Sequence, residues 1–441
     1  MNKRDAHVGR VSLRGVPRAL KAFLRAPGVI VSEVLLLAGL CILGASLPQA
    51  GRSSLEAVAR LHHQPTPIAW LVDTLGLDHV FTSPVFLAAL GVASASLVLV
   101  LTDQVRRFLL QWGATCTEAT FRHAPYRSEF WRATGQGARR RPGIRTRGKL
   151  GLAGSPLFHA GLLCLILAGG LRALFGVEAV VDLYEGERLP ATVEAWGAQW
   201  PGPLGEPFRM EVPLTLQRVD QARYANGDLK SLRAQVVLHQ AQGEETREVA
   251  VNQPLMTPRG TLFMDSTVAP AALVEWQQPG AEPVRQAILL ERKEAHAHGN
   301  YAQGPRGLQA RIRVPDAAGS FRPERAEVRI LRGGAVLAEG ALRAGESLAL
   351  PEGGVFRLYG LPPWIRLHAH HDPALGLSYA GFALALLGAI LIYGVVPVDE
   401  WIAMTPEGDG ERVQVALRPR RFTPLFRERF ERLVRDLGGT P

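Results

Sequence analysis

The chain has 441 residues, a formal net charge of +10 and 47% hydrophobic residues, which leaves room for several domains. Its apolar residues gather in four runs with charged segments between them, a layout typical of a polytopic membrane protein with one large extramembrane domain. The three cysteines form neither C-x-x-C nor C-x-x-C-H, which argues against a disulfide framework, a structural zinc site, a thioredoxin-like redox pair and covalent haem attachment.

The N-terminal part is predicted to be a basic cytoplasmic flank over residues 1–28, followed by a first transmembrane span over residues 29–47. A signal peptide is the competing interpretation, because small residues follow the apolar run. A retained anchor is favoured, since the run is longer than a typical signal-peptide core and its basic lead-in is extended. Glu33 lies near the inner end of this span, where its carboxylate either reaches the interface or pairs with another buried group.

The next three segments follow from the distribution of charge. Residues 48–83 contain few cations and are expected to form an outer loop, and residues 84–101 form a second span. Residues 102–154 are strongly basic and are predicted to be cytoplasmic by the positive-inside bias. The same charge argues against a nucleic-acid partner, because it flanks the spans, where it sets topology and meets the head groups of the lipid bilayer.

A third span over residues 155–176 carries one imidazole, His159, about one turn inside its inner end. An ionisable side chain inside a span is costly unless it faces other helices and has a partner or ligand. A hydrogen bond to a neighbouring helix is the simplest interpretation. The functional one is ligation of haem iron, because imidazole is its commonest axial ligand and an apolar groove can shelter the porphyrin. Glu33 lies at a similar depth, which permits a contact that would orient the ring.

Residues 177–373 change in character, because apolar residues recur there with a period of two between Gly, Pro, Asn and Asp. The clearest runs lie at residues 212–216, 232–238, 308–314 and 328–330. A Gly333-Gly334 turn follows the last of them. This pattern predicts an antiparallel β domain of sandwich or curved-sheet type. Its position after three spans predicts that it lies outside the cytoplasm.

A fourth span is predicted over residues 374–396, with Tyr379 and Tyr393 as interfacial anchors. The tail, residues 397–441, is predicted to be cytoplasmic and to carry an amphipathic helix. The apolar face of that helix includes Leu425, Phe426, Phe430, Leu433, Val434 and Leu437. The face fits the membrane surface or a docking partner equally well.

Three further imidazoles, His368, His370 and His371, stand just before the fourth span, at the predicted outer face. On a β-strand, His368 and His370 would share a face while His371 would point away. A solvated segment without function is the simplest interpretation. The alternative is an outer haem site, since histidines on both sides of a bilayer suit a molecule that enters inside and is presented outside.

Motifs of self-contained enzymes are missing from the sequence. There is no P-loop, no G-x-G-x-x-G between strand and helix, no G-x-S-x-G and no H-E-x-x-H. We therefore expect no catalytic residue in this chain acting alone.

The chain resembles the ResB family of the system II cytochrome c biogenesis machinery over nearly its whole length. The resemblance is carried by the order of three spans, β domain and final span, and by three local segments. These are Phe158-His159-Ala160-Gly161-Leu162-Leu163; Val251-Asn252-Gln253-Pro254-Leu255 with Gly260 and Phe263; and Asp372-Pro373 leading into Tyr379, Gly381, Phe382 and Gly388.

The resemblance implies a role beside a ResC/CcsA-type partner, which carries a tryptophan-rich haem-handling segment that this chain lacks. Together the pair exports haem b, bound transiently, keeps it reduced and supports its covalent attachment to apocytochrome c outside. His159 matches the intramembrane histidine of the family and is expected to ligate haem iron, with Glu33 as a neighbour that orients it. His368, His370 and His371 match no family motif.

These expectations place the chain in the bacterial inner membrane as a multi-pass protein with both termini cytoplasmic and the β domain outside. It would be a non-autonomous subunit of a holocytochrome c synthase complex. The rival interpretation is a membrane-anchored scaffold or chaperone that presents the β domain and binds no cofactor.

Overall fold

The structure, a computed structural model, describes residues 16–50, 53, 55–63, 65–114, 116–133, 135, 141–225, 228–293, 296–301, 304–315, 322–350 and 353–440. The first fifteen residues of the predicted basic flank lie outside the described residues. The chain folds as two compact units. The helical unit comprises Met1–Gln49, Ala59–Ala173 and Ala374–Pro441, and the β unit comprises Ala50–Val58 and Leu174–Pro373.

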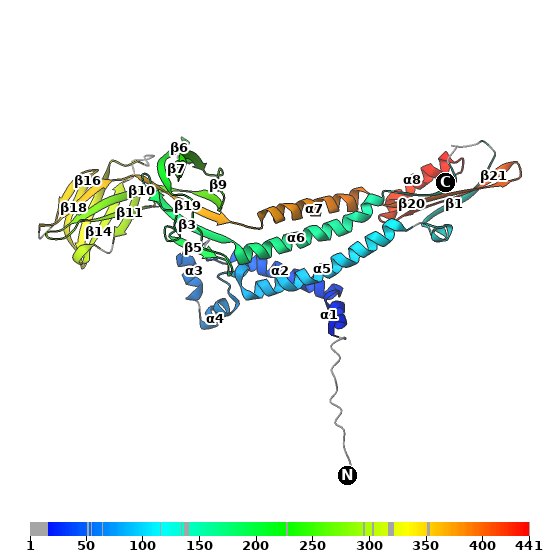
Figure 1. The fold of residues 1–441 in the computed structure, drawn as a ribbon, viewed down its shortest axis with the longest axis horizontal. Helices are drawn as coiled ribbons and strands as arrows, with labels where there is room; N and C mark the ends of the chain where they lie inside the picture. Colours follow the sequence, from blue (N-terminus) through cyan, green and yellow to red (C-terminus); the bar gives the residue numbers. More distant parts are fainter. Residues whose placement is uncertain are drawn as a thin grey trace, which may run out of the picture. The chain divides into compact units, whose positions relative to one another are not determined.

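The helical unit contains the long helices drawn in the middle of Figure 1. Its α-helices are α1 (Val16–Leu24), α2 (Pro27–Ser46), α4 (Thr66–Leu75), α5 (Pro84–Gly113), α6 (Gly154–Phe175), α7 (Leu375–Gly394) and α8 (Arg427–Asp436). Helix α3 (Leu55–His62) begins in the β unit and ends in the helical unit. Short 3₁₀ helices are η1 (Val80–Thr82), η2 (Glu118–Phe121), η3 (Lys149–Ala153) and η6 (Thr423–Phe426).

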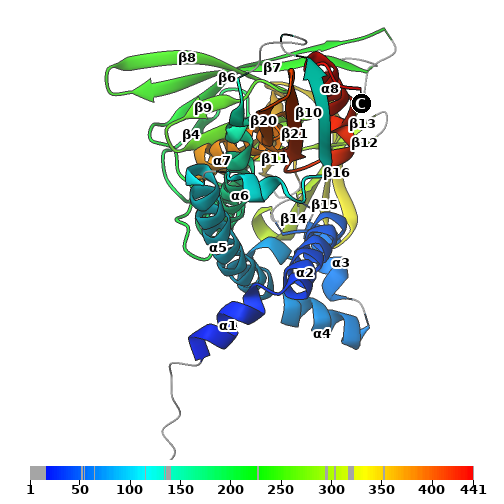
Figure 2. The same ribbon diagram turned by 90° about the vertical axis from the view of Figure 1, so that its right-hand side faces the viewer.

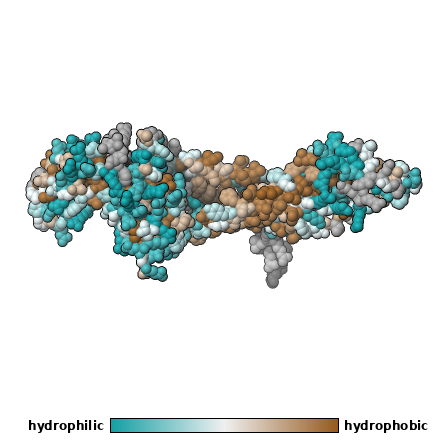
Figure 3. Space-filling view, turned by 90° about the horizontal axis from the view of Figure 1, so that it is seen from above, coloured by the Kyte–Doolittle hydropathy of each residue, from teal (hydrophilic) through white to brown (hydrophobic). Residues whose placement is uncertain are grey.

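Within the described residues, four helices are long and apolar enough to cross a membrane, which confirms the four apolar segments predicted from the sequence. They are Pro27–Ser46, Pro84–Gly113, Lys149–Phe175 and Leu375–Gly394. Many of their leucine, valine and isoleucine side chains are exposed, and Figure 3 shows hydrophobic surface gathered over the helices. Such a continuous apolar surface requires lipid or protein to cover it.

Helix α5 is longer than its apolar run. The predicted span ends at Leu101, whereas the helix continues to Gly113 and so includes the first part of the predicted basic loop. No glycine or proline stands between these two positions, so nothing in the sequence interrupts the helix. Hydropathy located the end of the apolar run, which is not the end of the helix.

A four-stranded antiparallel sheet, here called the loop–tail sheet, joins two distant parts of the helical unit. Strands β1 (Tyr126–Ala133) and β2 (Gly143–Arg147) come from the segment between α5 and α6. Strands β20 (Val398–Glu407) and β21 (Gly410–Pro419) come from the tail, and the order is β1-β21-β20-β2. The sequence pattern did not predict these strands, because their arginines were attributed to topology and their partners lie far away in the chain.

Helix α8 corrects the prediction for the tail. The predicted amphipathic helix is present, and most of its apolar face packs against a sheet of the same chain. Phe430, Leu433, Val434 and Leu437 are buried against the loop–tail sheet, in a core that includes Val413, Val415 and Leu417. The sequence analysis considered a membrane surface and a partner protein for this face, but not a sheet of the same chain. Leu425, in contrast, is 79% exposed and takes no part in this core.

The β unit confirms the predicted large antiparallel β domain. Its strands are β3 (Val177–Tyr184), β4 (Arg188–Leu189), β5 (Ala198–Pro201), β6 (Leu214–Arg223), β7 (Leu229–Gln240), β8 (Gly243–Ala250), β9 (Leu255–Thr257), β10 (Gly260–Gln277), β11 (Val284–Leu289), β12 (Glu291–Lys293), β13 (His296–Tyr301), β14 (Leu308–Pro315), β15 (Arg325–Arg332), β16 (Ala335–Arg343), β17 (Ser347–Ala349), β18 (Val355–Gly360) and β19 (Pro363–His371). A short 3₁₀ helix, η4 (Pro305–Gly307), precedes β14. The predicted apolar runs at 212–216, 232–238, 308–314 and 328–330 fall on β6, β7, β14 and β15.

The described strands of the β unit form three sheets around two large hydrophobic cores, with a smaller cluster of Ala269, Ala271 and Trp364. The main sheet has the order β17-β18-β10-β19-β3-β5, with β9 and β11 also paired to β10. The sheet β4-β6-β7-β8 packs with the main sheet around one core, and the sheet β12-β13-β14-β15-β16 encloses the other. The long strands β7 and β8 are seen at the top of Figure 2. Strand β10 contributes to both cores, and its pairing with β19 is interrupted by an irregularity between Met264 and Val268. The β unit is therefore two sandwich-like halves that share one long strand.

Candidate functional site

The predicted ligand His159 lies in the first turns of α6 and is partly exposed. Its Nδ1 is 2.8 Å from the carbonyl oxygen of Ser155, one turn earlier in the same helix. A carbonyl oxygen can only accept, so Nδ1 carries the hydrogen and donates it. In the neutral ring the lone pair is then on Nε2. The Phe158 ring stands edge-on to the imidazole, with 5.8 Å between ring centroids.

Close contact between α6 and α7 fixes the rotation of α6. A Cβ added at Gly154 would lie 2.8 Å from the backbone nitrogen of Ile392, and one added at Gly381 would lie 3.0 Å from the carbonyl oxygen of Gly161. Only glycine allows backbones to approach so closely, which is how small residues pack helices in apolar surroundings. His159 lies between the two levels at which the helices touch, so its direction is set by backbone contacts.

The face of α6 that carries His159 is different from the face that touches α7. His159 and Gly170 are separated by about three turns and differ by roughly 20° around the helix axis. A Cβ added at Gly170 would lie 3.2 Å from the Leu90 side chain of α5. His159 therefore lies on the same side of α6 as Gly170, the side that faces α5 near the C-terminal end of α6.

Glu33 is held by α5 rather than by His159. The hydroxyl of Ser96, which is 2% exposed, donates a hydrogen bond of 2.8 Å to Glu33 Oε1. Among the described residues no hydrogen bond or ion pair joins Glu33 to His159. The hydrogen bond between Glu33 and His159, which their similar depth in the sequence would permit, is therefore not made. The Ser155 carbonyl orients the ring instead, a role that sequence reasoning had given to Glu33.

The outer histidine group lies on β19, where the pleat separates its members as the sequence predicted. His368 and His370 are on one face of the main sheet, beside β10 and β3, and His371 is on the opposite face. His368 Nε2 is 3.7 Å from Asp265 Oδ2, and His370 Nδ1 is 3.7 Å from Glu178 Oε1. The two rings thus turn toward carboxylates on opposite neighbouring strands and do not converge on one point.

Asp265 is the carboxylate beside His368 whose protonation is shifted. Burial alone would raise its pKa. Hydrogen bonds from the backbone N–H groups of Thr267 and Ser266 and the charge of His368 outweigh burial, so the pKa of the Asp265 carboxyl lies below its ordinary value. Asp265 is therefore ionised at neutral pH.

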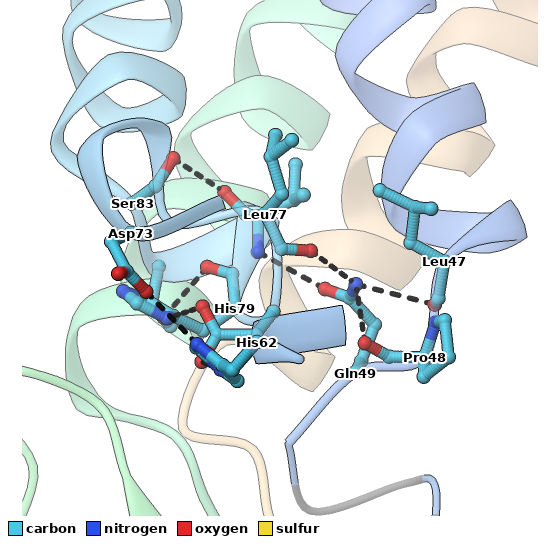
Figure 4. A network of polar contacts seen from close by, with 11 residues as sticks. Leu47, Pro48, Gln49, His62, Asp73, Leu77, His79 and Ser83 are labelled. Atoms are coloured by element: carbon cyan, nitrogen blue, oxygen red, sulfur yellow. Dashed lines mark hydrogen bonds and ion pairs between the residues drawn. The ribbon is translucent and has the colours of Figure 1, made fainter. Parts of the chain in front are cut away.

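A polar network that the sequence analysis did not foresee lies in the segment between α2 and α5 (Figure 4). His62 Nδ1 is 2.9 Å from Asp73 Oδ1, and His62 Nε2 is 3.6 Å from Asp78 Oδ2. His79 Nδ1 is 2.6 Å from the other oxygen of Asp78. We call His62, Asp73, Asp78 and His79 the loop cluster. Only the side-by-side Asp78-His79 pair could have indicated it, because the other two members come from α3 and α4.

Comparison with known proteins bears on this arrangement. A search of the curated proteins finds no match. The model of the ResB-like family matches residues 30–357, which is more than half of the chain. The matched range includes Glu33, the loop cluster and His159, and it ends before the histidines of β19.

Proposed function

Because the chain belongs to the ResB-like family, whose general role is cytochrome c biogenesis, we propose that it is a membrane subunit that handles haem for that process. With a ResC/CcsA-type partner it exports haem across the membrane and supports covalent attachment of haem to apocytochrome c outside. The observation that carries the proposal is the geometry of His159, whose Nε2 lone pair is left free by the Nδ1 hydrogen bond to Ser155.

The proposed topology places the protein in the bacterial inner membrane with both termini in the cytoplasm. The four apolar helices α2, α5, α6 and α7 are the spans. The basic segment between α5 and α6 lies inside, in line with the positive-inside bias, and the tail after α7 lies on the same side. The β unit, between α6 and α7, then lies outside, where apocytochrome c is matured.

The residues around His159 fit haem as the transported substrate. Within the described part of the chain no three potential metal-binding side chains are gathered around one point. Among these residues, His159 therefore has no neighbouring side chains with which to hold a bare metal ion. One imidazole nitrogen in an apolar helix suits an iron that already has four porphyrin nitrogens. The exposed apolar side chains of α6, including Leu167 and Leu171, provide surface for the hydrophobic body of the porphyrin.

His159 is the one histidine within the four apolar helices that the structure describes, so the partner would supply the opposing ligand. His159 binds and orients haem, with its ring held by Ser155 and edge-on to Phe158. No residue of the chain is assigned a covalent catalytic step. The protein is therefore a subunit of a holocytochrome c synthase, and haem b stays with it transiently.

The test compares His159→Ala with a matched control, Leu163→Ala, which removes a side chain from the same face of α6 but keeps the imidazole. Each variant is purified with its ResC/CcsA-type partner, and the Soret absorbance is measured per mole of complex. We expect a severalfold lower absorbance for His159→Ala and an unchanged value for Leu163→Ala.

A second variant separates ligation from a structural role. In His159→Gly, added imidazole can occupy the vacated space and bind iron, so it should restore the Soret band. Equal haem content in His159→Ala and the unaltered complex would remove His159 from the ligand set. A complex that never contains haem, yet still assembles, would favour the scaffold that binds no cofactor.

A further inference from the structure

A short helix, α1, precedes the first apolar helix and is separated from it by a break. Helix α1 ends at Leu24, the backbone of Ala26 is extended with ψ of 128°, and Pro27 opens α2. Proline disfavours a helical conformation in the residue before it, so the helix breaks at this point. Figures 1 and 2 both show α1 turned out of the line of α2. The chain therefore changes direction before it enters α2.

The apolar face of α1 is left uncovered by the described part of the chain. Leu20 and Phe23, three residues apart, share one side of the helix and are 54% and 59% exposed. Arg18 and Lys21 are exposed too, and at 100° per residue they lie on the opposite side. An uncovered apolar face with cations opposite is typical of a helix that lies in the plane of a membrane surface.

An ion pair fixes the level of this helix against α5. Arg25, the residue after α1, has its Nη2 3.1 Å from Asp103 Oδ1. Asp103 comes two residues after Leu101, where the apolar run of α5 ends. Helix α1 is thus held at the level where the hydrocarbon core of a membrane would end.

Two arginines of α5 extend the positive charge on the same side. Arg106 and Arg107 follow Asp103 by three and four residues, so they lie one turn further along that side of the helix, and both are exposed. Arg106 is five residues past Leu101, about 7.5 Å along the helix, which falls within a head-group layer roughly 5–8 Å thick. Among the described residues 16–25 and 102–113, Asp103 is the only acidic one, and Arg25 pairs with it.

Four cations at this level, here called the inner collar, are Arg18, Lys21, Arg106 and Arg107. None of their side chains forms a hydrogen bond or ion pair with another described residue. We propose that the inner collar, together with Leu20 and Phe23, binds anionic phospholipids of the inner leaflet. The cations pair with the lipid phosphates, and the two apolar side chains enter the acyl layer. This proposal rests on the proposed topology, which places this end of α5 at the cytoplasmic surface.

The ligand class follows from the two kinds of side chain at the site. A free phosphate or a nucleotide would pair with the cations but would leave Leu20 and Phe23 in water. A phospholipid supplies a phosphate and acyl chains together. Val31 and Val34 of α2 are 56% and 61% exposed, so uncovered apolar side chains run on from α1 into the span. The surface that needs lipid around the span therefore includes α1.

The first test measures lipid binding. The full chain in detergent is titrated with phosphatidylglycerol, phosphatidylcholine or glycerol phosphate, and the molecules retained are counted by native mass spectrometry. We expect phosphatidylglycerol to bind more tightly than phosphatidylcholine, and glycerol phosphate not to bind. Arg106→Gln with Arg107→Gln should weaken phosphatidylglycerol binding about fivefold for each charge removed, whereas Arg106→Lys with Arg107→Lys should preserve it.

The matched control is Arg418→Gln with Arg435→Gln, which removes the same charge from exposed positions of β21 and α8 and should leave lipid binding unchanged. No preference for phosphatidylglycerol, an equal loss in this control, or equally tight binding of glycerol phosphate would each overturn the proposal. A protein surface or a soluble phosphate would then be the occupant of the inner collar.

The second test separates the proposal from the topology on which it rests. Phe23→Cys and Leu35→Cys, the latter at a 66% exposed position of α2, are made in the chain without native cysteines and labelled with an environment-sensitive fluorophore. The chains are reconstituted into phosphatidylcholine–phosphatidylglycerol vesicles that carry a nitroxide on the lipid. We expect position 23 to be quenched best by a nitroxide near the head group, and position 35 by one deep in the acyl chain. Quenching at position 35 alone would overturn the proposal and keep the topology, whereas quenching at neither would overturn both.

Discussion

At the scale of single residues, the direction of one hydrogen bond determines what His159 can bind. If Nδ1 donates to Ser155, the ring presents Nε2 as a base. An amide side chain could imitate the hydrogen bond but not the ligand, so His159→Gln should fold normally and lose haem, as His159→Ala does. This distinction matters because histidines inside spans also serve purely structural contacts.

A residue-scale prediction concerns Asp265, whose pKa is lowered in the folded chain by hydrogen bonds and by His368 against the effect of burial. A carboxylate with a lowered folded pKa contributes stability above its unfolded pKa of about 3.9 and loses that contribution as pH falls through the folded value. Asp265→Asn should therefore lower the denaturant midpoint of the full chain at pH 7 and pH 5, with the difference shrinking below about pH 4.

The control for Asp265 is Glu282→Gln, which removes a carboxylate from an exposed segment before β11 and should leave the midpoints unchanged. A difference between Asp265→Asn and the unaltered chain that stays constant from pH 7 to pH 3 would contradict the assignment.

At the scale of elements, the contact between α6 and α7 depends on glycines at matched heights. Gly161→Val would place a branched side chain against the backbone of α7 near Gly381 and Ala385. We expect a loss of about 1–3 kcal/mol, typical of overpacking, and a lower yield of haem-containing complex, because α6 must shift or rotate. Thermal unfolding in detergent and the Soret absorbance measure the two effects.

Gly169→Val is the matched control for that contact, since it lies in the same helix with no atom within 4 Å of the added Cβ. It should leave both measurements near those of the unaltered chain. Similar losses in both variants would mean that helix propensity, not helix contact, is responsible.

Helix α8 gives a second prediction at the element scale. Leu433 is 5% exposed in the core of the loop–tail sheet, whereas Leu425, just before the helix, is 79% exposed. Leu433→Ala should cost about 2–5 kcal/mol and make the tail sensitive to protease, whereas Leu425→Ala should change stability by less than about 0.5 kcal/mol. The reverse result would favour a helix that docks on a membrane surface through Leu425.

At the scale of the whole molecule, the proposed topology can be tested with single cysteines. Gln242→Cys lies on the β7–β8 turn and Asp409→Cys on the β20–β21 turn, in a chain whose native cysteines at 41, 116 and 164 are replaced by serine. We expect a membrane-impermeant maleimide to label position 242 from outside intact cells, and position 409 only after the cells are opened. Labelling of both from the same side would contradict the topology.

The sequence predicted those parts of the fold in which the pattern is local. Apolar length revealed four helices, and period-two alternation revealed β6, β7, β14 and β15. The loop–tail sheet was missed because β1 pairs with β21, nearly three hundred residues later in the chain. In addition, the arginines of β1 and β2 were attributed to the positive-inside bias, so they did not indicate strands.

The residues of the candidate site could also be predicted only where the sequence pattern is local. His159 was identified from its cost inside an apolar run, but the partner of its ring was not, because depth along a helix does not fix direction around it. Glu33 therefore looked like a neighbour of His159 and is instead bonded to Ser96. The loop cluster needs the packing of α3, α4 and a turn, which no spacing in the sequence encodes.

The pairing of β2 with β20 has a consequence for synthesis. Strands β20 and β21 follow α7 in the chain, so β1 and β2 have no strand partners until the segment after α7 has been synthesised. A product that stops early exposes two unsatisfied strand edges to quality-control proteases. Pairing of β1 and β2 therefore depends on synthesis of the strands that follow α7.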